Sequence, residues 1–279
     1  MQQLVELGLA LGEDEVGLAL IRRFPDGRSR SESAQVPELA RDGNRLLEQI
    51  DQFLKSCDSG VSELDRIALC AGPGGFTRVR VACAVAQGIG MARNIPVAPI
   101  NSMQAAAVAV WQMEHAGSNS ADAGLRPMQV CVLLDARMKA LYAATYQIAV
   151  SDNPSGLPVV TVLRKPGLLA LEDVPGYFVH LPPLPEGAGS DRRISGDGAD
   201  RYLPLARDSQ EAAGKWLGAE NVAFCQPAAC ELALAALAVA QPADWMPASR
   251  VAPFYLREKV ALNIEEQAAL RAANRQARL

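Results

Sequence analysis

The sequence contains little histidine, few aromatic residues and no excess of basic side chains. Aromatic residues make up 5% of the 279 residues, and the formal net charge is −4 at pH 7. Without a stripe of lysine and arginine, this chain alone is not expected to bind nucleic acid directly and tightly. The two histidines, His115 and His180, are far apart and have no acidic cluster beside them. A histidine-based metal site is therefore not predicted.

The cysteines and the apolar runs argue against a zinc site and a membrane protein. The six cysteines include no Cys-x-x-Cys pair, and Cys225 and Cys230 make a poor zinc pair without further ligands. We expect buried, reduced thiols in a cytoplasmic protein. The longest apolar run, Leu232–Ala240, is too short to span a bilayer, and the first residues lack the basic flank of a signal peptide. No membrane association is predicted.

A glycine-rich loop, Gly72-Pro73-Gly74-Gly75, separates a predicted buried strand at 66–71 from a predicted helix at 78–93. Three glycines in four positions indicate a sharp turn, or a backbone held close to a ligand or partner. Thr77 stands where the helix N-cap is expected. The glycines are not followed by lysine or by a sixth-position glycine, so the P-loop and the dinucleotide fingerprint are excluded. An anion-binding loop and a simple capped turn both stay open.

Hydrophobic periodicity predicts strands and helices that alternate in two halves. Strands are expected at 4–11, 16–21, 28–36, 66–71, 96–100, 129–135, 140–148, 159–163 and 221–225, and another strand is expected to end at 194–196. Helices are expected at 44–57, 78–93, 103–115, 228–240 and 265–279. The stretch 174–193 is predicted to be loop, with one strand at 177–181.

Each half opens with a hairpin and continues into alternating strands and helices. The predicted fold class is therefore α/β, with the duplicated two-lobe outline of actin-like and sugar-kinase-like ATPases. Periodicity alone does not distinguish this outline from other two-lobed α/β folds. We expect a first lobe at 1–101, a second lobe at 102–250, and a C-terminal segment with a charged tail at 251–279.

Six segments, in order between residues 66 and 261, resemble one known family. They lie at 67–80, 86–90, 134–142, 196–202, 227–228 and 253–261. The stretch Gly72-Pro73-Gly74-Gly75-Phe76-Thr77-Arg78-Val79-Arg80 is similar to G-P-G-S-F-T-G-x-R of the TsaB (YeaZ) family, and Asp135-Ala136-Arg137 with Tyr142 resembles its D-A-R-x-x-x-x-Y hairpin.

The resemblance implies an actin-like fold and a role in bacterial tRNA modification, in which N6-threonylcarbamoyladenosine is made next to the anticodon. It implies a non-catalytic subunit that pairs with a TsaD-type catalytic subunit, with a TsaE-type ATPase joining them. The chain would form a homodimer when alone and would contact tRNA only indirectly.

The resemblance also implies that the helices at 44–57 and 78–93 form the partner interface. The residues assigned to this interface are Leu47, Ile50, Leu54, Arg78, Ala82, Ala86, Ile89 and Gly90. Small residues at intervals of four would let another helix approach closely. For Ala82, Ala86 and Gly90, packing on this chain's own sheet is at least as well supported, because one face of the helix must cover the sheet.

The first strand departs from the pattern of active superfamily members, because Ala10 stands where they have aspartate. The acidic turn Glu13-Asp14-Glu15 follows and would repel a phosphate unless Mg²⁺ intervened. We therefore predict no catalytic residue, metal or cofactor, and at most weak ATP binding. The remnants of a nucleotide loop would be Gly72, Gly74, Gly75, Thr77, Asp135, Arg137, Gly196 and Asp197. For Asp135 the simpler alternative is a turn in which its carboxylate caps the backbone and pairs with Arg137.

Three functions compete at this point. The first is the partner subunit described above. The second is a free-standing nucleotide-binding phosphotransferase of the same fold, and the third is a homodimeric structural protein. Complex formation, Mg-ATP binding and oligomeric mass would separate them.

Overall fold

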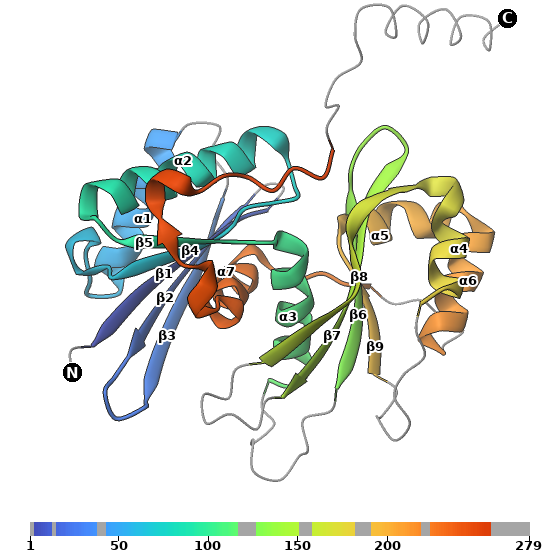
Figure 1. Cartoon of the computed structure of the whole chain (residues 1–279), viewed down its shortest axis with the longest axis horizontal. Coiled ribbons are helices and arrows are strands. Elements are labelled where there is room, and N and C mark those ends of the chain that lie inside the picture. The colour runs from blue at the N-terminus through green and yellow to red at the C-terminus, as the bar shows by residue number, and fades with distance from the viewer. Residues whose placement is uncertain are drawn as a thin grey trace, which may run out of the picture.

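The computed structural model describes residues 3–12, 15–37, 43–116, 127–150, 158–181, 191–218 and 224–257. In this part of the chain, strands and helices form two units side by side, each built on one sheet (Figure 1). The first sheet contains β1 (Leu4–Leu11), β2 (Glu15–Arg23), β3 (Ser29–Pro37), β4 (Arg66–Cys70), β5 (Pro96–Ile100) and β11 (Met246–Pro247). The second contains β6 (Met128–Asp135), β7 (Ala140–Val150), β8 (Pro158–Ala170), β9 (Asp191–Ser195) and β10 (Phe224–Cys225). The helices are α1 (Gly43–Ser56), α2 (Phe76–Arg93), α3 (Ser102–Glu114), α4 (Val174–Val179), α5 (Asp197–Tyr202), α6 (Arg207–Leu217) and α7 (Ala229–Val239).

The two sheets repeat one topology. The first has the order β11-β5-β4-β1-β2-β3, and the second has the order β10-β9-β6-β7-β8. In the first sheet β1 is antiparallel to β2 and parallel to β4, and in the second β6 is antiparallel to β7 and parallel to β9. The predicted fold class, a duplicated two-lobe α/β architecture, is therefore confirmed.

Helices cover both faces of each sheet. Helices α1 and α2 pack on one face of the first sheet, where Leu46, Ile50 and Ile89 join the leucines of β1 and β2 in one core. Helices α3 and α7 pack against each other between the two sheets, in a second core shared by both units (Figure 1). Helices α4, α5 and α6 lie on the far face of the second sheet.

Helix α7 follows the second sheet in the sequence but packs on the first. Gly8 and Gly17 make this possible: a Cβ on Gly17 would lie 1.8 Å from the carbonyl oxygen of Ala229, and one on Gly8 would lie 2.4 Å from that of Ala233. The next strand, β11, pairs with β5 in the first sheet. The chain thus returns to the first unit before residue 250. Helix α7 and strand β11 fall within the predicted second lobe at 102–250 but pack on or pair with the first sheet.

The local structure differs from the expectations in the second unit. Residues 174–179 form helix α4 where a loop with a strand at 177–181 was predicted, and Tyr177 and Phe178 are buried against α6 and the second sheet, whereas residues 182–190 lie outside the described residues. Helices α5 and α6 were not predicted. The acidic residues Glu13 and Asp14 and the tail helix at 265–279 lie outside the described residues.

Candidate functional site

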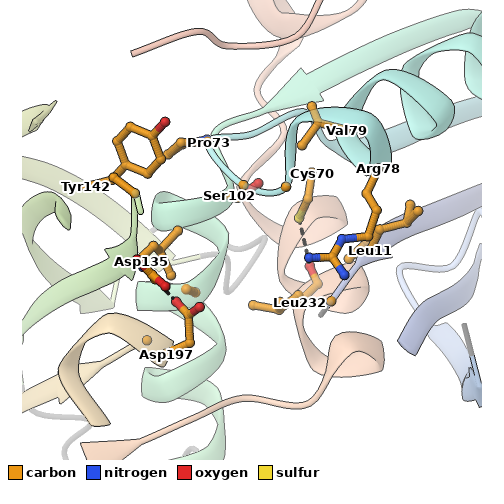
Figure 2. Close-up of a pocket in the computed structure, with 18 of the residues that line it drawn as sticks. Leu11, Cys70, Pro73, Arg78, Val79, Ser102, Asp135, Tyr142, Asp197 and Leu232 are labelled. Atoms are coloured by element: carbon orange, nitrogen blue, oxygen red, sulfur yellow. Dashed lines mark hydrogen bonds between the residues drawn. The ribbon is translucent and has the colours of Figure 1, made fainter. Parts of the chain in front are cut away.

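A cavity of about 750 Å³ lies between the two units, and the ends of both sheets contribute to its walls. Figure 2 shows Asp135 and Asp197 on one side and Leu11, Arg78 and Leu232 on the other. Six of the eight predicted loop residues line this cavity: Gly74, Gly75, Asp135, Arg137, Gly196 and Asp197. The tertiary structure therefore brings together loops that are more than 50 residues apart in the sequence.

The glycine-rich loop joins β4 to α2 and is tied to two other segments. The N–H of Gly72 donates to Ser102 Oγ (3.0 Å), and the N–H of Ser102 donates to the carbonyl of Gly72 (2.8 Å). Gly72 has a φ of +104°, and a Cβ there would lie 3.1 Å from the carbonyl oxygen of Phe254. Glycine is needed at this position for its conformation and for space, so the loop first serves a tight backbone contact.

The start of α2 differs from the prediction. The helix begins at Phe76 with Gly75 as its N-cap and no side-chain cap, so the predicted cap at Thr77 is wrong. The guanidinium of Arg78 folds back over the loop, where a Cβ on Gly75 would lie 2.8 Å from Arg78 Nε. Arg78 therefore lines the cavity between the units instead of the outer face of α2.

The end of β1 supplies an uncharged wall. Ala10 is buried and lines the cavity together with Leu11 and Gly12. Glu15, at the start of β2, is a nearby acidic lining residue. A phosphate group at this wall would meet the methyl group of Ala10 and the carboxylate of Glu15, and the guanidinium of Arg78 is the cation on the same side of the cavity.

Asp135, at the end of β6, has its carboxylate fully engaged. The backbone N–H of Arg137 donates to Asp135 Oδ1 (2.7 Å), and the guanidinium of Arg137 lies 3.1 Å from Oδ2. Arg201 also pairs with Oδ2, and the hydroxyl of Tyr202 is 3.3 Å from Oδ1. The turn-capping alternative for Asp135 is therefore the one observed, and α5 adds partners that sequence spacing did not indicate.

The turn before α5 packs directly on the end of β6. Asp197 Oδ1 accepts a hydrogen bond from the backbone N–H of Asp135 (3.0 Å). Gly196 has a φ of +105°, and a Cβ on it would lie 2.2 Å from the carbonyl oxygen of Leu133. Ser195 Oγ is buried beside this turn, lines the cavity and has no hydrogen-bond partner among the described residues. This wall is closely packed and includes one buried hydroxyl without a hydrogen-bond partner among the described residues.

The residues assigned to a partner interface are mostly inside the first unit. Ile50, Leu54, Ala82, Ala86, Ile89 and Gly90 are all buried in the core between the helices and the first sheet. A Cβ on Gly90 would lie 2.6 Å from the Cβ of Ala248. These six cannot themselves contact a partner in this conformation, and for Ala82, Ala86 and Gly90 the own-sheet alternative is the one observed. Leu47 is exposed on α1.

The exposed row of α2 is displaced from the predicted one by one or two residues. Ala84, Gly88 and Met91 face away from the sheet, and a Cβ on Gly88 would meet no atom within 4 Å. Because α2 is rich in small apolar residues on all its faces, spacing alone does not indicate which row faces the sheet.

Within the described residues, the candidate metal ligands do not cluster, and the most deeply buried thiols are not reactive. Within the described residues, no three His, Cys, Asp or Glu side chains lie close enough to hold a metal ion. Burial raises the pKa of the Cys70 and Cys131 thiols to about 12 and that of Cys83 to about 11. Buried thiols of this kind are chemically inert. In the same part of the chain, none of the helices is both long and apolar enough to cross a membrane.

Comparison with known proteins gives one family-level match. The model of the TsaD family, described as tRNA N6-adenosine threonylcarbamoyltransferase, matches residues 31–172, which are 142 of the 279 residues. Over 144 residues the chain is 31% identical to the tRNA threonylcarbamoyladenosine biosynthesis protein TsaB of Haemophilus influenzae, covering 51% of this chain and 53% of the relative. Over 113 residues it is 33% identical to the tRNA N6-adenosine threonylcarbamoyltransferase of Nitratidesulfovibrio vulgaris, covering 36% of this chain and 30% of the relative.

A solved structure supports the fold. YeaZ from Pseudomonas aeruginosa superposes with a TM-score of 0.61 at 21% identity, and the match covers 91% of this chain and 100% of that chain. The alignment with the Haemophilus relative spans about half of the length of that relative. The structural likeness therefore concerns the fold, and the sequence matches concern part of each curated relative.

Proposed function

The chain belongs to the TsaB/YeaZ family, and on this premise we propose that it is a partner subunit in the threonylcarbamoyladenosine modification of tRNA. In this proposal it binds and activates a TsaD-type catalytic subunit and does not itself transfer the threonylcarbamoyl group. A TsaE-type ATPase joins the complex, the chain forms a homodimer when alone, and tRNA is contacted through the partner. In this proposal, helices α1 and α2 of the first unit contact the TsaD-type subunit.

The observation that carries the proposal is that apolar and small residues are exposed on the outer face of α1 and α2. Leu47 on α1 is 42% exposed and Met91 on α2 is 64% exposed. Ala84 and Gly88 on α2 are exposed and small, so a partner helix could approach the backbone of α2 closely. Apolar side chains beside small ones favour helix-on-helix packing, because burial of methyl and thioether groups stabilises the contact.

The cavity between the units supports a non-catalytic role. At Ala10 a buried methyl group replaces the carboxylate that starts the phosphate loop in active superfamily members. The carboxylate of Asp135 is held by Arg137 and Arg201. A cation that bound the Asp135 carboxylate would have to displace two guanidinium groups, which is costly for a carboxylate that is nearly fully buried.

The test is a mixing experiment with the TsaD-type protein of the same organism, measured by size exclusion with light scattering. The unaltered chain is expected to elute in a mixed complex, and Gly88→Arg is expected to elute separately and to lower the modification rate to that measured without this chain. Since nothing lies within 4 Å of a Cβ at Gly88, the substitution should leave the fold intact.

Val179→Arg is the matched control. It adds the same charge at a well-exposed apolar residue on α4, in the other unit. A mixed complex that tolerates Gly88→Arg as well as Val179→Arg would overturn the proposed interface. Steady release of phosphate from Mg-ATP by the chain alone would overturn the non-catalytic role.

A further inference from the structure

A C-terminal segment without helix or strand runs from the first unit to the second. This segment, residues 251–257, comes shortly after β11 and follows α2 towards the second unit (Figure 1). Four of its residues line the interlobe cavity, namely Phe254, Tyr255, Leu256 and Arg257. We call residues 251–257 the strap. Its contacts show which end is anchored and which end can be released.

The first part of the strap is anchored on the first unit by its backbone. Gln87 Nε2, on α2, donates to the carbonyl of Val251 (2.8 Å), and the Val251 side chain is buried in the core of the first unit. The backbone N–H of Phe254 donates to the carbonyl of Ala71 (2.8 Å), just before the glycine-rich loop. These hydrogen bonds satisfy backbone groups of the strap at both ends of α2 and fix its course along the first unit.

The side chain of Tyr255 adds a third anchor on the first unit. Arg80 Nε donates to the Tyr255 hydroxyl (2.7 Å), and the Arg80 guanidinium lies 3.4 Å from the ring centroid of Phe76. The ring centroids of Phe76 and Tyr255 are 6.1 Å apart. A cation between two aromatic rings is favourable, so this group holds the middle of the strap on the start of α2.

The last two residues of the strap reach beyond the first unit. Arg257 Nη1 donates to the carbonyl of Ala136, at the end of β6 in the second unit (2.9 Å). The neighbouring Leu256 is partly buried and packs against the core that both units share. The strap therefore joins the first unit to the second across the cavity whose wall it forms.

The acceptor on the second unit belongs to a well-defined turn. The backbone N–H of Ala136 donates to the carbonyl of Ala140 (3.0 Å), which closes the turn between β6 and β7. Within it Arg137, Met138 and Lys139 have left-handed φ angles of 61°, 54° and 57°. Residues with a Cβ adopt this conformation only where the surrounding structure holds them in it. Arg257 therefore meets a carbonyl whose position does not depend on the strap.

We propose that the strap is a releasable tie that keeps the interlobe cavity closed. The cavity opens when Arg257 leaves the Ala136 carbonyl and Leu256 leaves the shared core, while residues 251–255 stay bound to the first unit. Arg257 is half-buried, so water can replace the lost carbonyl and the opening is local. This inference goes beyond the proposed function, because it concerns access of small molecules to the cavity and not the outer face of α2.

The test uses the chain alone and reads cavity opening from the thiol of Cys70. Cys70 is buried, lines the cavity and lies 3.7 Å through its Sγ from the carbonyl oxygen of Leu232 (Figure 2). The reagent is N-ethylmaleimide at constant pH, and mass spectrometry of peptides gives the labelling rate of each cysteine. Cys83 and Cys131 are buried in the separate cores of the first and second units, so their rates report the unfolding of each unit.

Arg257→Ala removes a hydrogen bond from a charged donor and is expected to label Cys70 about tenfold faster, with the rates of Cys83 and Cys131 unchanged. Leu256→Ala is expected to act in the same direction. Arg250→Ala is the matched control, because it removes an exposed arginine next to the strap and should leave every rate unchanged. The inference is overturned if neither strap variant speeds the labelling of Cys70, if Arg250→Ala speeds it as much, or if Cys83 and Cys131 are accelerated as much as Cys70.

Discussion

Replacing Glu6 with glutamine perturbs a buried ion-pair group in the first sheet. The Glu6 side chain is fully buried and pairs with both Arg23 and Arg66, with Arg66 Nε 2.6 Å from Glu6 Oε1. The Arg66 guanidinium also lies 4.3 Å from the ring centroid of Trp245, in the segment that leads to β11. Glutamine keeps the shape of the side chain but removes its charge, so two guanidinium groups lose their counter-ion.

The expected loss follows from the burial of the three groups. Breaking a fully buried ion pair from one side costs about 3–5 kcal/mol. Here the side chains of Arg23 and Arg66 are 33% and 27% exposed, so water partly solvates them after the change. We therefore expect Glu6→Gln to lower the free energy of unfolding by about 2–3 kcal/mol. For a chain of this size the Tm should fall by roughly 4–10 °C.

Thermal unfolding followed by circular dichroism measures this loss, with Asp26→Asn as the control. Asp26 pairs with Arg28 at 2.7 Å, but both side chains are largely exposed. An exposed pair contributes less than about 1 kcal/mol, so the control should shift the Tm only slightly. Equal shifts for Glu6→Gln and Asp26→Asn would refute the reasoning that burial makes the Glu6 group matter.

Two further predictions concern packing and pH. Gly17→Ala should destabilise the fold by at least about 3 kcal/mol, because its Cβ would lie 1.8 Å from the carbonyl oxygen of Ala229. Gly88→Ala, in open space on α2, should instead raise the free energy of unfolding by about 0.5–1 kcal/mol. Urea unfolding of both variants measures the difference, and equal midpoints would contradict the prediction. Burial raises the pKa of the Cys70 and Cys131 thiols from 9.0 to about 12, so the folded chain keeps protons that the unfolded chain releases. The free energy of unfolding should therefore fall as the pH rises from about 9 to 12, by roughly 1.4 kcal/mol per pH unit for each thiol. Urea midpoints from pH 8 to 10.5 would show the fall, and an unchanged slope in Cys131→Ala would contradict the assignment.

Local sequence patterns predicted most of the strands and helices that build the two sheets. The apolar run at 66–71, the glycine-rich loop and the helix after it appear in the structure close to their expected positions. These elements could be predicted because the conformation of a buried strand, a glycine turn or a helix depends largely on residues that are neighbours in the sequence. Helix α4 was missed because its proline and glycine are also typical of loops, and it is stabilised by the burial of Tyr177 and Phe178.

The arrangement of the site depended on contacts that local patterns do not encode. The loops with Gly74, Asp135 and Asp197 were predicted separately. The packing of the two units against each other places these loops around one cavity. The partner of Asp135 at Arg201 lies 66 residues away, so no spacing rule could indicate it. Helix spacing likewise did not reveal that the row with Ala82 and Ala86 faces inward.

The sequence by itself determined most of the strands and helices and the glycine turn, because these follow from single residues and their neighbours. Only the tertiary structure decided which face of α2 meets solvent, that α7 returns to the first sheet, and that the left-handed turn at Met138 lines the same cavity as Phe76 and Tyr255. Those outcomes depend on which distant surfaces are buried together, and burial is a property of the whole packed chain.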